Sequence, residues 1–266
     1  LKLSAVNSIN WARILAQVVY YVFAYARVFA KTGKPASFCV PTGNFGNVYA
    51  GYAAKKMGAP IEKLIVATNS NDILHRFFTS GEMRIEAASP TLSPSMDIQV
   101  SSNFERLLFD LCGRDGAKVA GIMKSFRKTG VFCLDAAAMK ILHETFVSFR
   151  VDDADTLAEI KKTYVERGYM ADPHTAVGLH AARAYGARHP DKTVITLATA
   201  HPAKFPDAVR RATGVVPALP PHLADIYDRQ ERYEVLPPDA AAIGAHIRTA
   251  VLGWKSRCPK GNLSPS

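Results

Sequence analysis

One segment, residues 37–57, constrains the fold of this chain more than any other. Residues 37–40 are small or apolar, as in a buried strand. The composition of residues 48–57 predicts a helix, and Gly58 is placed to end it. The turn between them reads Pro41-Thr42-Gly43-Asn44-Phe45-Gly46-Asn47. A strand, a glycine-containing turn and a helix in this order direct several backbone N–H groups at one point, which is a layout that binds anions.

The turn by itself leaves two interpretations open. Gly43 and Gly46 permit positive φ and let a ligand approach the backbone closely. The pattern is neither G-x-G-x-x-G nor G-x-x-x-x-G-K-[ST], which argues against a common dinucleotide site and against a Walker-A site. The other interpretation is an ordinary strand-to-helix turn in which an Asn side chain caps the helix.

The segments that follow predict an α/β fold. Residues 63–69 form a second short apolar run, so that strand, helix and strand make a βαβ unit with parallel strands and a right-handed crossover. The same rhythm returns with a helix from Asp172 to about residue 188 and a strand at 194–199. We therefore predict an open, mostly parallel sheet with helices on both faces. Residues 76–170 are mainly helical and break the rhythm, which indicates an insertion.

We expect four parts along the chain. An α/β part that binds phosphate spans residues 1–75, and the helical insertion spans 76–170. A second α/β part spans 171–252; it includes a Pro-rich connection with one helical piece at 223–230 and a last helix at 239–251. Residues 253–266 are expected to be a mobile tail.

The first helix is expected to start at Asn7 or Ser8, either of which can be its N-cap, and to end before Gly33. Apolar residues cover much of its circumference, which is typical of a helix covered on both sides. Its most apolar run, between Arg13 and Arg27, holds thirteen residues and is too short to span a bilayer. Arg13 is either a surface charge or a group that holds an anion beside the helix dipole.

Composition narrows the classes of function. The net charge of +10 is spread along the chain without a basic run interleaved with aromatics, so nucleic-acid binding has only the charge in its favour, whereas an anionic substrate suits a positive field. The four cysteines are far apart and form no C-x-x-C pattern, which favours a reducing cytoplasm over a disulfide or zinc site. His174 and His201 are each expected to make structural hydrogen bonds, and no metal site is expected.

Seven segments, taken together with their order and approximate spacing, resemble the threonine synthase family. The resemblance covers about residues 1–250 and leaves the tail unmatched. The segments are Asn7-Ser8-Ile9-Asn10-Trp11-Ala12-Arg13-Ile14, Pro41-Thr42-Gly43-Asn44-Phe45-Gly46-Asn47, Asn71-Asp72-Ile73-Leu74, Thr91-Leu92-Ser93-Pro94-Ser95-Met96-Asp97-Ile98, Ser101-Ser102-Asn103-Phe104-Glu105-Arg106-Leu107, Asp172-Pro173-His174-Thr175-Ala176-Val177-Gly178 and Thr199-Ala200-His201-Pro202-Ala203-Lys204-Phe205.

The resemblance implies a lyase of fold type II that depends on pyridoxal 5′-phosphate. It would convert O-phospho-L-homoserine and water to L-threonine and phosphate, the last step of threonine biosynthesis. The residues implied to bind the cofactor phosphate are Gly43, Asn44, Phe45, Gly46 and Asn47. The hydroxyl of Thr199 is implied to lie against the pyridine nitrogen, so that residues 171–252 complete the cofactor site. Ser8, Asn10 and Arg13 are the candidates that bind substrate, because a dianionic phosphate suits a helix start beside an Arg.

The chain departs from the family in one respect. Family members carry the cofactor on the Schiff-base lysine of a Phe-Lys-Asp segment upstream of everything matched, and this sequence has no such segment. The catalytic residue is therefore unknown in this chain. We expect this chain to be the carboxy-terminal part of a threonine synthase. Because it begins at Leu1, we expect a truncated or processed form, and we expect the 266 residues alone to be inactive.

Two other readings remain open, a non-catalytic α/β module that binds a phosphorylated metabolite through the 41–47 turn and a basic nucleic-acid-binding protein. We expect a small-molecule substrate, a cytoplasmic location and neither nucleic acid nor membrane as partner, and the sequence does not indicate an oligomeric state.

Overall fold

The computed structural model describes residue 5 and residues 7–257, and the chain divides into two compact units at Ala218. The first unit holds a four-stranded sheet in the order β5-β2-β1-β6, and every neighbouring pair in it is parallel. Cys39 of β1 lies opposite Ile65 of β2 and Thr196 of β6. The sheet strands are β1 (Ala36–Pro41), β2 (Ile61–Thr68), β5 (Phe146–Arg150) and β6 (Thr193–Thr196).

Helices precede and follow these strands along the chain. In the first unit they are α1 (Trp11–Thr32), α2 (Gly46–Lys56), α3 (Ile73–Ser80), α4 (Phe104–Leu111), α5 (Gly116–Thr129), α6 (Ala136–Thr145), α7 (Asp153–Arg167), α8 (Pro173–Arg188) and α9 (Pro206–Thr213), with short 3-10 turns η1 (Pro94–Met96) and η2 (Pro202–Lys204). Two further short strands, β3 (Glu82–Arg84) and β4 (Val131–Cys133), form an antiparallel pair. The second unit contains the 3-10 turn η3 (Pro221–Leu223) and α10 (Ala240–Arg257).

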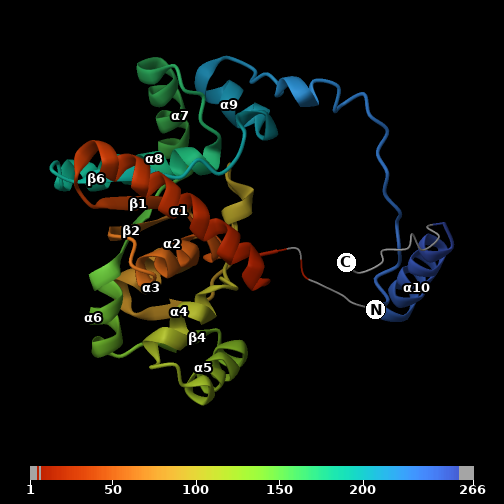
Figure 1. Ribbon diagram of the computed structural model, residues 1–266, viewed down its shortest axis with the longest axis horizontal. Coiled ribbons are helices and arrows are strands. Elements are labelled where there is room, and N and C mark those ends of the chain that lie inside the picture. The colour runs from red at the N-terminus through yellow and green to blue at the C-terminus, as the bar shows by residue number, and fades with distance from the viewer. Residues whose placement is uncertain (1–4, 6, 258–266) are drawn as a thin grey trace, which may run out of the picture. The chain divides into compact units, whose positions relative to one another are not determined.

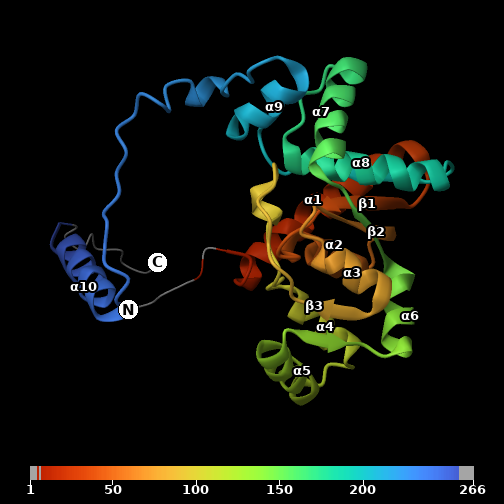
Figure 2. The same ribbon diagram turned by 180° about the vertical axis from the view of Figure 1, so that it is seen from behind.

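Alternate residues of the central strands face two separate hydrophobic layers. Phe38 and Val40 belong to the layer that holds α1, α2, α3 and α4, whereas Cys39 belongs to the layer with Val177 and Ala181 of α8. This follows from the two-residue period of a strand, because successive side chains point to opposite faces. Figures 1 and 2 show α8 on one side of β1 and β2 and α2 on the other. The predicted parallel sheet with helices on both faces is therefore confirmed.

Residues 76–170 are mainly helical, and they also contribute a strand to the main sheet. β5 pairs in parallel with β2, so that Phe146 lies opposite Leu64. The remaining residues of this stretch include α4, α5 and α6 and the β3–β4 pair. The division into four parts along the chain stays a prediction.

The first helix differs from the prediction at its start and in its burial. α1 begins at Trp11, and the side chain of Asn10, not of Asn7 or Ser8, caps it by accepting the N–H of Ala12. Several capping residues in a row make such a start ambiguous in sequence. α1 buries only one stripe, Ile14, Val18 and Tyr21.

The outer side of α1 is exposed, so the expectation of a helix covered on both sides is wrong for the residues that the structure describes. Its exposed apolar side chains include Trp11, Leu15, Val19, Val22 and Phe23. Among the described helices, α1 is also long and apolar enough to cross a membrane by length and composition, in contrast to the expectation from its thirteen-residue apolar run, and 17% of the relevant window is buried in the protein. Mostly buried core helices of soluble proteins and signal sequences pass the same criterion.

Two boundaries in the second unit also differ. A helical piece was predicted at 223–230, but only residues 221–223 form a 3-10 turn, and residues 224–228 continue as hydrogen-bonded turns without an α-helix. The last helix, α10, continues to Arg257, beyond the predicted end at residue 251. The tail predicted from residue 253 is therefore wrong up to Arg257, and residues 258–266 lie outside the described residues.

Candidate functional site

The turn after β1 begins α2 without a side-chain cap. Its N-cap is Phe45, which adopts the left-handed conformation with φ of 62° and makes no capping hydrogen bond. The Asn cap of the ordinary-turn interpretation is therefore wrong. A left-handed bulky residue costs about 1–2 kcal/mol, and the fully buried Phe45 ring, in contact with Phe104 and Phe146, offsets this cost.

The carbonyl groups of the turn are held from one side. The hydroxyl of Ser101 donates to the carbonyl oxygen of Gly43 at 3.0 Å, and Asn103 donates its backbone N–H and its side-chain amide to that of Asn44 at 3.1 and 3.0 Å. A trans peptide group points its C=O and N–H in opposite directions. The N–H groups of Asn44 and Phe45 therefore point away from this clamp, and no hydrogen bond among the described residues uses them.

Both glycines of the turn are required by close contacts. A Cβ at Gly43 would lie 2.9 Å from the carbonyl oxygen of Ser95, and a Cβ at Gly46 would lie 2.8 Å from Cβ of Ser8. Real Cβ atoms do not approach other atoms this closely. The turn is therefore fitted between the start of the chain and the segment around Ser95.

A cavity of about 490 Å³ opens beside the turn, and it is suited to an anion. Among the described residues that line it, Arg13 is the one cation and there is no carboxylate. The first turn of α2 adds backbone N–H groups without intrahelical partners and the positive end of the helix dipole. The lining residues are Asn7, Ser8, Arg13, Gln17, Pro41, Thr42, Gly43, Asn44, Phe45, Gly46, Asn47 and Ser95.

Two tyrosines of α1 fix the side chain of Asn47. The hydroxyl groups of Tyr20 and Tyr21 donate to Oδ1 of Asn47 at 2.5 and 2.9 Å, and Tyr21 also donates to the backbone carbonyl of Asn47 at 2.9 Å. Burial raises the pKa of both tyrosines, that of Tyr20 to about 12 against a smaller opposite effect of Arg13, so both stay protonated donors at neutral pH. With its oxygen occupied in this way, the Asn47 amide offers only N–H donors to the cavity.

A second cavity, of about 680 Å³, adjoins the first. Gln17 and Asn47 line both cavities, so the two are contiguous. Its walls are mostly apolar, and Thr199 lies at the end of the segment that follows β6. Oε1 of Gln17 is buried and has no hydrogen-bond partner among the described residues, which leaves an acceptor available where the cavities meet. The lining residues are Gln17, Tyr20, Phe23, Ala24, Asn47, Ile195, Thr196, Leu197, Ala198 and Thr199.

The residues singled out from the sequence divide between these cavities. Gly43 to Asn47 line the first cavity and Thr199 the second. Ser8 and Arg13 join the turn in the first cavity, and the hydroxyl of Ser8 accepts the side-chain amide of Asn103 at 2.8 Å. Asn10 lines neither cavity, because its side chain caps α1 and donates to the carbonyl of Ala5.

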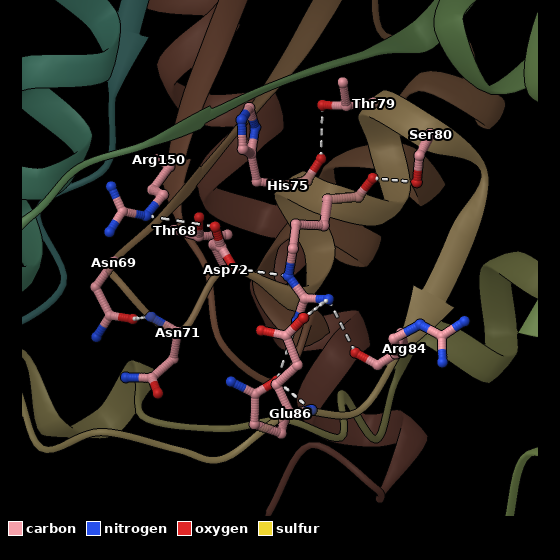
Figure 3. Close-up of polar contacts among 12 residues, drawn as sticks. Thr68, Asn69, Asn71, Asp72, His75, Thr79, Ser80, Arg84, Glu86 and Arg150 are labelled. Atoms are coloured by element: carbon pink, nitrogen blue, oxygen red, sulfur yellow. Dashed lines mark hydrogen bonds and ion pairs between the residues drawn. The ribbon is translucent and has the colours of Figure 1, made fainter. Parts of the chain in front are cut away.

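In the described part of the chain, the polar residues at the carboxyl end of β2 bond to other residues of the protein. Asp72 forms ion pairs with Arg76 and Arg150, at 2.8 and 3.3 Å, and Figure 3 shows the pair with Arg150. The side-chain amides of Asn69 and Asn71 both donate to Oδ1 of Asp97, at 2.7 and 2.9 Å. The polar residues that follow β2 therefore hold the segment that carries Ser95 against the turn.

Sequence reasoning did not single out several residues that shape the site. Asn103 belongs to a segment quoted for the family resemblance, but its clamp on the turn gives no local pattern. Tyr20 and Tyr21 read as part of an apolar helix face, and Gln17 as a polar interruption of it. Helical spacing places Gln17, Tyr20 and Tyr21 near one another, and this was the available signal.

Comparisons with known proteins agree with the resemblance seen in the sequence. Residues 175–247 match the family model described as "Threonine synthase, C-terminal". The threonine synthase of Pseudomonas aeruginosa is 49% identical over 247 residues, which are 92% of this chain and 52% of that protein. The threonine synthase of Saccharomyces cerevisiae is 47% identical over 225 residues, which are 78% of this chain and 44% of that protein. The chain thus spans about half the length of the curated relatives it matches.

Solved structures give the same result for the fold. A PLP-bound threonine synthase from Brucella melitensis superimposes with a TM-score of 0.87 at 46% identity, covering 94% of this chain and 53% of that chain. The threonine synthase from yeast superimposes with a TM-score of 0.85 at 39% identity, and the match covers 94% of this chain and 54% of that chain. Both similarities extend over nearly all of the chain and confirm the predicted fold class.

Proposed function

The chain belongs to the threonine synthase family, and we propose on this premise that it forms one side of the active site of a pyridoxal 5′-phosphate-dependent lyase. The reaction proposed is the conversion of O-phospho-L-homoserine and water to L-threonine and phosphate. Because the chain spans about half the length of its relatives, we assign this activity to the complete gene product.

The observation that carries the proposal is the fit of the two contiguous cavities to this cofactor. The first offers the backbone N–H groups of the 43–47 turn and the Asn47 amide, with no carboxylate among its described lining residues, which suits the cofactor phosphate. The second has apolar walls that suit an aromatic ring, and it ends at the hydroxyl of Thr199. A phosphate in the first and a pyridine ring in the second match the two ends of pyridoxal 5′-phosphate.

Each residue then has a definite task. The N–H groups of Gly43, Asn44, Phe45, Gly46 and Asn47 hold the cofactor phosphate. Bound pyridoxal phosphate supplies an electron sink for the negative charge that develops on the substrate carbons. The hydroxyl of Thr199 is a neutral partner for the ring nitrogen, so it orients the ring without the charge that a carboxylate would bring close to that nitrogen.

We place the substrate phosphate beside the start of α1. Ser8 and Arg13 line the phosphate cavity, where Arg13 neutralises charge and the hydroxyl of Ser8 orients an oxygen. The side chain of Asn10 is occupied as the cap of α1, so we assign it the task of positioning this helix start rather than contacting the phosphate. Positioning of the substrate here determines which of its bonds is held against the ring.

The Schiff-base lysine is proposed to lie outside these 266 residues. Its task is to carry the cofactor and move protons between substrate carbons. Borohydride reduction of the cofactor-loaded gene product, followed by peptide mass spectrometry, identifies it. The proposal requires an adduct outside the present sequence, and a stoichiometric adduct on Lys204 or another lysine of this chain contradicts it. We also propose a cytoplasmic enzyme whose partners are small molecules.

Turnover of O-phospho-L-homoserine by the complete gene product tests the proposed function. Gly46→Ala brings a methyl group within 2.8 Å of Ser8 and should abolish cofactor binding and turnover together. Gly121→Ala in α5 is the matched control, because a Cβ there meets nothing within 4 Å. Release of phosphate and threonine that is lost only in Gly46→Ala supports the proposal. Phosphate-ester binding without turnover in the unmodified protein would favour the non-catalytic module instead.

A further inference from the structure

One buried carboxylate, that of Asp172, is linked through His174 and Thr175 to both ends of the proposed cofactor site. Asp172 is 1% exposed and lies at the start of α8. Its Oδ1 accepts the backbone N–H groups of His174 and Thr175, at 2.9 and 3.3 Å, and lies 3.1 Å from Nδ1 of His174. Its Oδ2 accepts the hydroxyl of Thr175. Burial acts to raise the pKa of Asp172, but the hydrogen bonds from His174 and Thr175 outweigh it and lower the pKa, so the carboxylate stays ionised.

The first arm leads from Asp172 to Thr199. Since Thr175 donates its hydroxyl hydrogen to Asp172, the lone pairs of that oxygen face other donors. The backbone N–H of Thr199 donates to Thr175 Oγ1 at 3.1 Å. Thr199 lies beyond the end of β6 and is exposed, so this bond fixes a backbone that the sheet no longer holds.

The second arm leads from Asp172 to Ser95. Nε2 of His174 is the acceptor for the backbone N–H of Ser95 at 3.2 Å. A ring nitrogen that accepts carries no hydrogen, so the hydrogen of the neutral ring is on Nδ1 and is donated to Asp172. The carbonyl of Ser95 is the atom that a Cβ at Gly43 would meet at 2.9 Å. The position of Ser95 therefore sets the wall against which the phosphate turn is packed.

We propose that Asp172 is a positioning residue that sets the separation between the phosphate turn and Thr199, by ordering His174 toward one and Thr175 toward the other. This inference rests on the proposed function, because it treats the two cavities as the site of one ligand. Asp172 touches neither cavity and acts only through its two neighbours.

A helix cap alone does not account for these contacts. Capping α8 requires only the bonds to the backbone N–H groups of His174 and Thr175. The contacts of Asp172 with the His174 ring and the Thr175 hydroxyl are additional to the cap. His174 in turn accepts a hydrogen bond from Ser95, and Thr175 accepts one from Thr199. Thr175→Val leaves both cap bonds in place and removes the hydroxyl that bonds Asp172 and Thr199. It therefore separates positioning from helix stability.

Three variants of the complete gene product test the first arm. Thr175→Val should raise the dissociation constant for pyridoxal 5′-phosphate about tenfold, the worth of one hydrogen bond, and accelerate amide exchange at Thr199 by at least as much. Thr175→Ser restores the hydroxyl and should restore both values. Thr163→Val is the control, because Thr163 is equally buried in α7 and donates to the carboxylate of Glu159 at 2.7 Å, away from both cavities.

The second arm is tested with inorganic phosphate as the probe, followed through the amide resonances of Gly43 and Gly46. His174→Leu removes the acceptor for Ser95 and should weaken phosphate binding about fivefold, whereas Thr175→Val leaves it unchanged. His174→Gln retains an acceptor and should bind phosphate more tightly than His174→Leu. Asp172→Asn, which removes the charge that orders both arms, should weaken binding of phosphate and of pyridoxal phosphate together.

The outcomes separate this inference from the proposed function. Amide exchange at Thr199 needs no ligand, so an unchanged exchange rate in Thr175→Val overturns the inference whatever the protein binds. Equal cofactor affinities in Thr175→Val and Thr163→Val overturn it as well. Failure of the unmodified protein to bind pyridoxal phosphate, with fast exchange at Thr199 in Thr175→Val, refutes the proposed function while the hydrogen-bonded arm stands.

Discussion

Replacing Asn47 by Asp reverses the polarity of a side chain that two hydrogen bonds hold in place beside the cavity proposed to bind phosphate. The amide oxygen of Asn47 already accepts the hydroxyl groups of Tyr20 and Tyr21, so only its nitrogen faces the ligand as a donor. In Asn47→Asp the tyrosines still donate to a carboxylate oxygen of the same shape. The fold is therefore retained, while the donor toward the cavity becomes a negatively charged acceptor.

The size of the effect follows from charge and distance. Two unit charges about 4 Å apart at a partly exposed site interact by about 4 kcal/mol, and loss of a hydrogen bond to a charged group adds about 1.5–3 kcal/mol. Asn47→Ala loses the hydrogen bond without adding charge. Asn47→Asp should therefore bind pyridoxal 5′-phosphate on the order of a hundredfold to a thousandfold more weakly than Asn47→Ala, which itself binds more weakly than the unmodified protein.

Equilibrium titration of the cofactor by absorbance, with the free energy of unfolding measured in parallel, decides this prediction. The unfolding measurement confirms that both variants are folded. The reasoning is refuted if Asn47→Asp binds the cofactor as tightly as Asn47→Ala, because the Asn47 nitrogen would then not face the phosphate.

Two further predictions concern stability. Burial raises the pKa of Tyr20 from 10.0 to about 12, so folding favours its protonated form; this stabilisation is complete below pH 10 and lost as the pH rises through 12. Urea midpoints measured from pH 9 to 12 should consequently fall less steeply in Tyr20→Phe, and equal slopes would contradict this. Arg183→Met should lower the free energy of unfolding by about 3–5 kcal/mol, because it leaves the buried Glu159, which Arg183 pairs at 2.8 Å, with Thr163 as its remaining partner. Chemical denaturation measures that loss, and a change below about 1 kcal/mol would contradict the expectation.

The 41–47 turn could be predicted from the sequence because its determinants are local. A strand, two glycines and a helix start follow one another, and the structure forms strand, turn and helix at those residues. The parallel sheet followed from the same rhythm of apolar runs. Thr199, by contrast, came only from the family resemblance, since no local pattern distinguishes its hydroxyl from any other.

Features that depend on distant partners were not predictable in this way. The contact of Tyr20 and Tyr21 with Asn47 requires α1 to lie on α2, and the chain pattern does not give that packing. The exposed outer face of α1 was not predictable for the same reason. Apolar residues all round a helix do not indicate which of its sides the described chain covers. The cap at Asn10 was missed because its neighbours Asn7 and Ser8 have equal capping ability.

The crystal structure of the complete gene product with pyridoxal 5′-phosphate tests the central claim most directly. The account predicts phosphate oxygens within hydrogen-bond distance of the N–H groups of the 43–47 turn and of the Asn47 amide. It also predicts the ring nitrogen against the hydroxyl of Thr199. A phosphate bound elsewhere, or a ring nitrogen that faces any group other than Thr199, would contradict it.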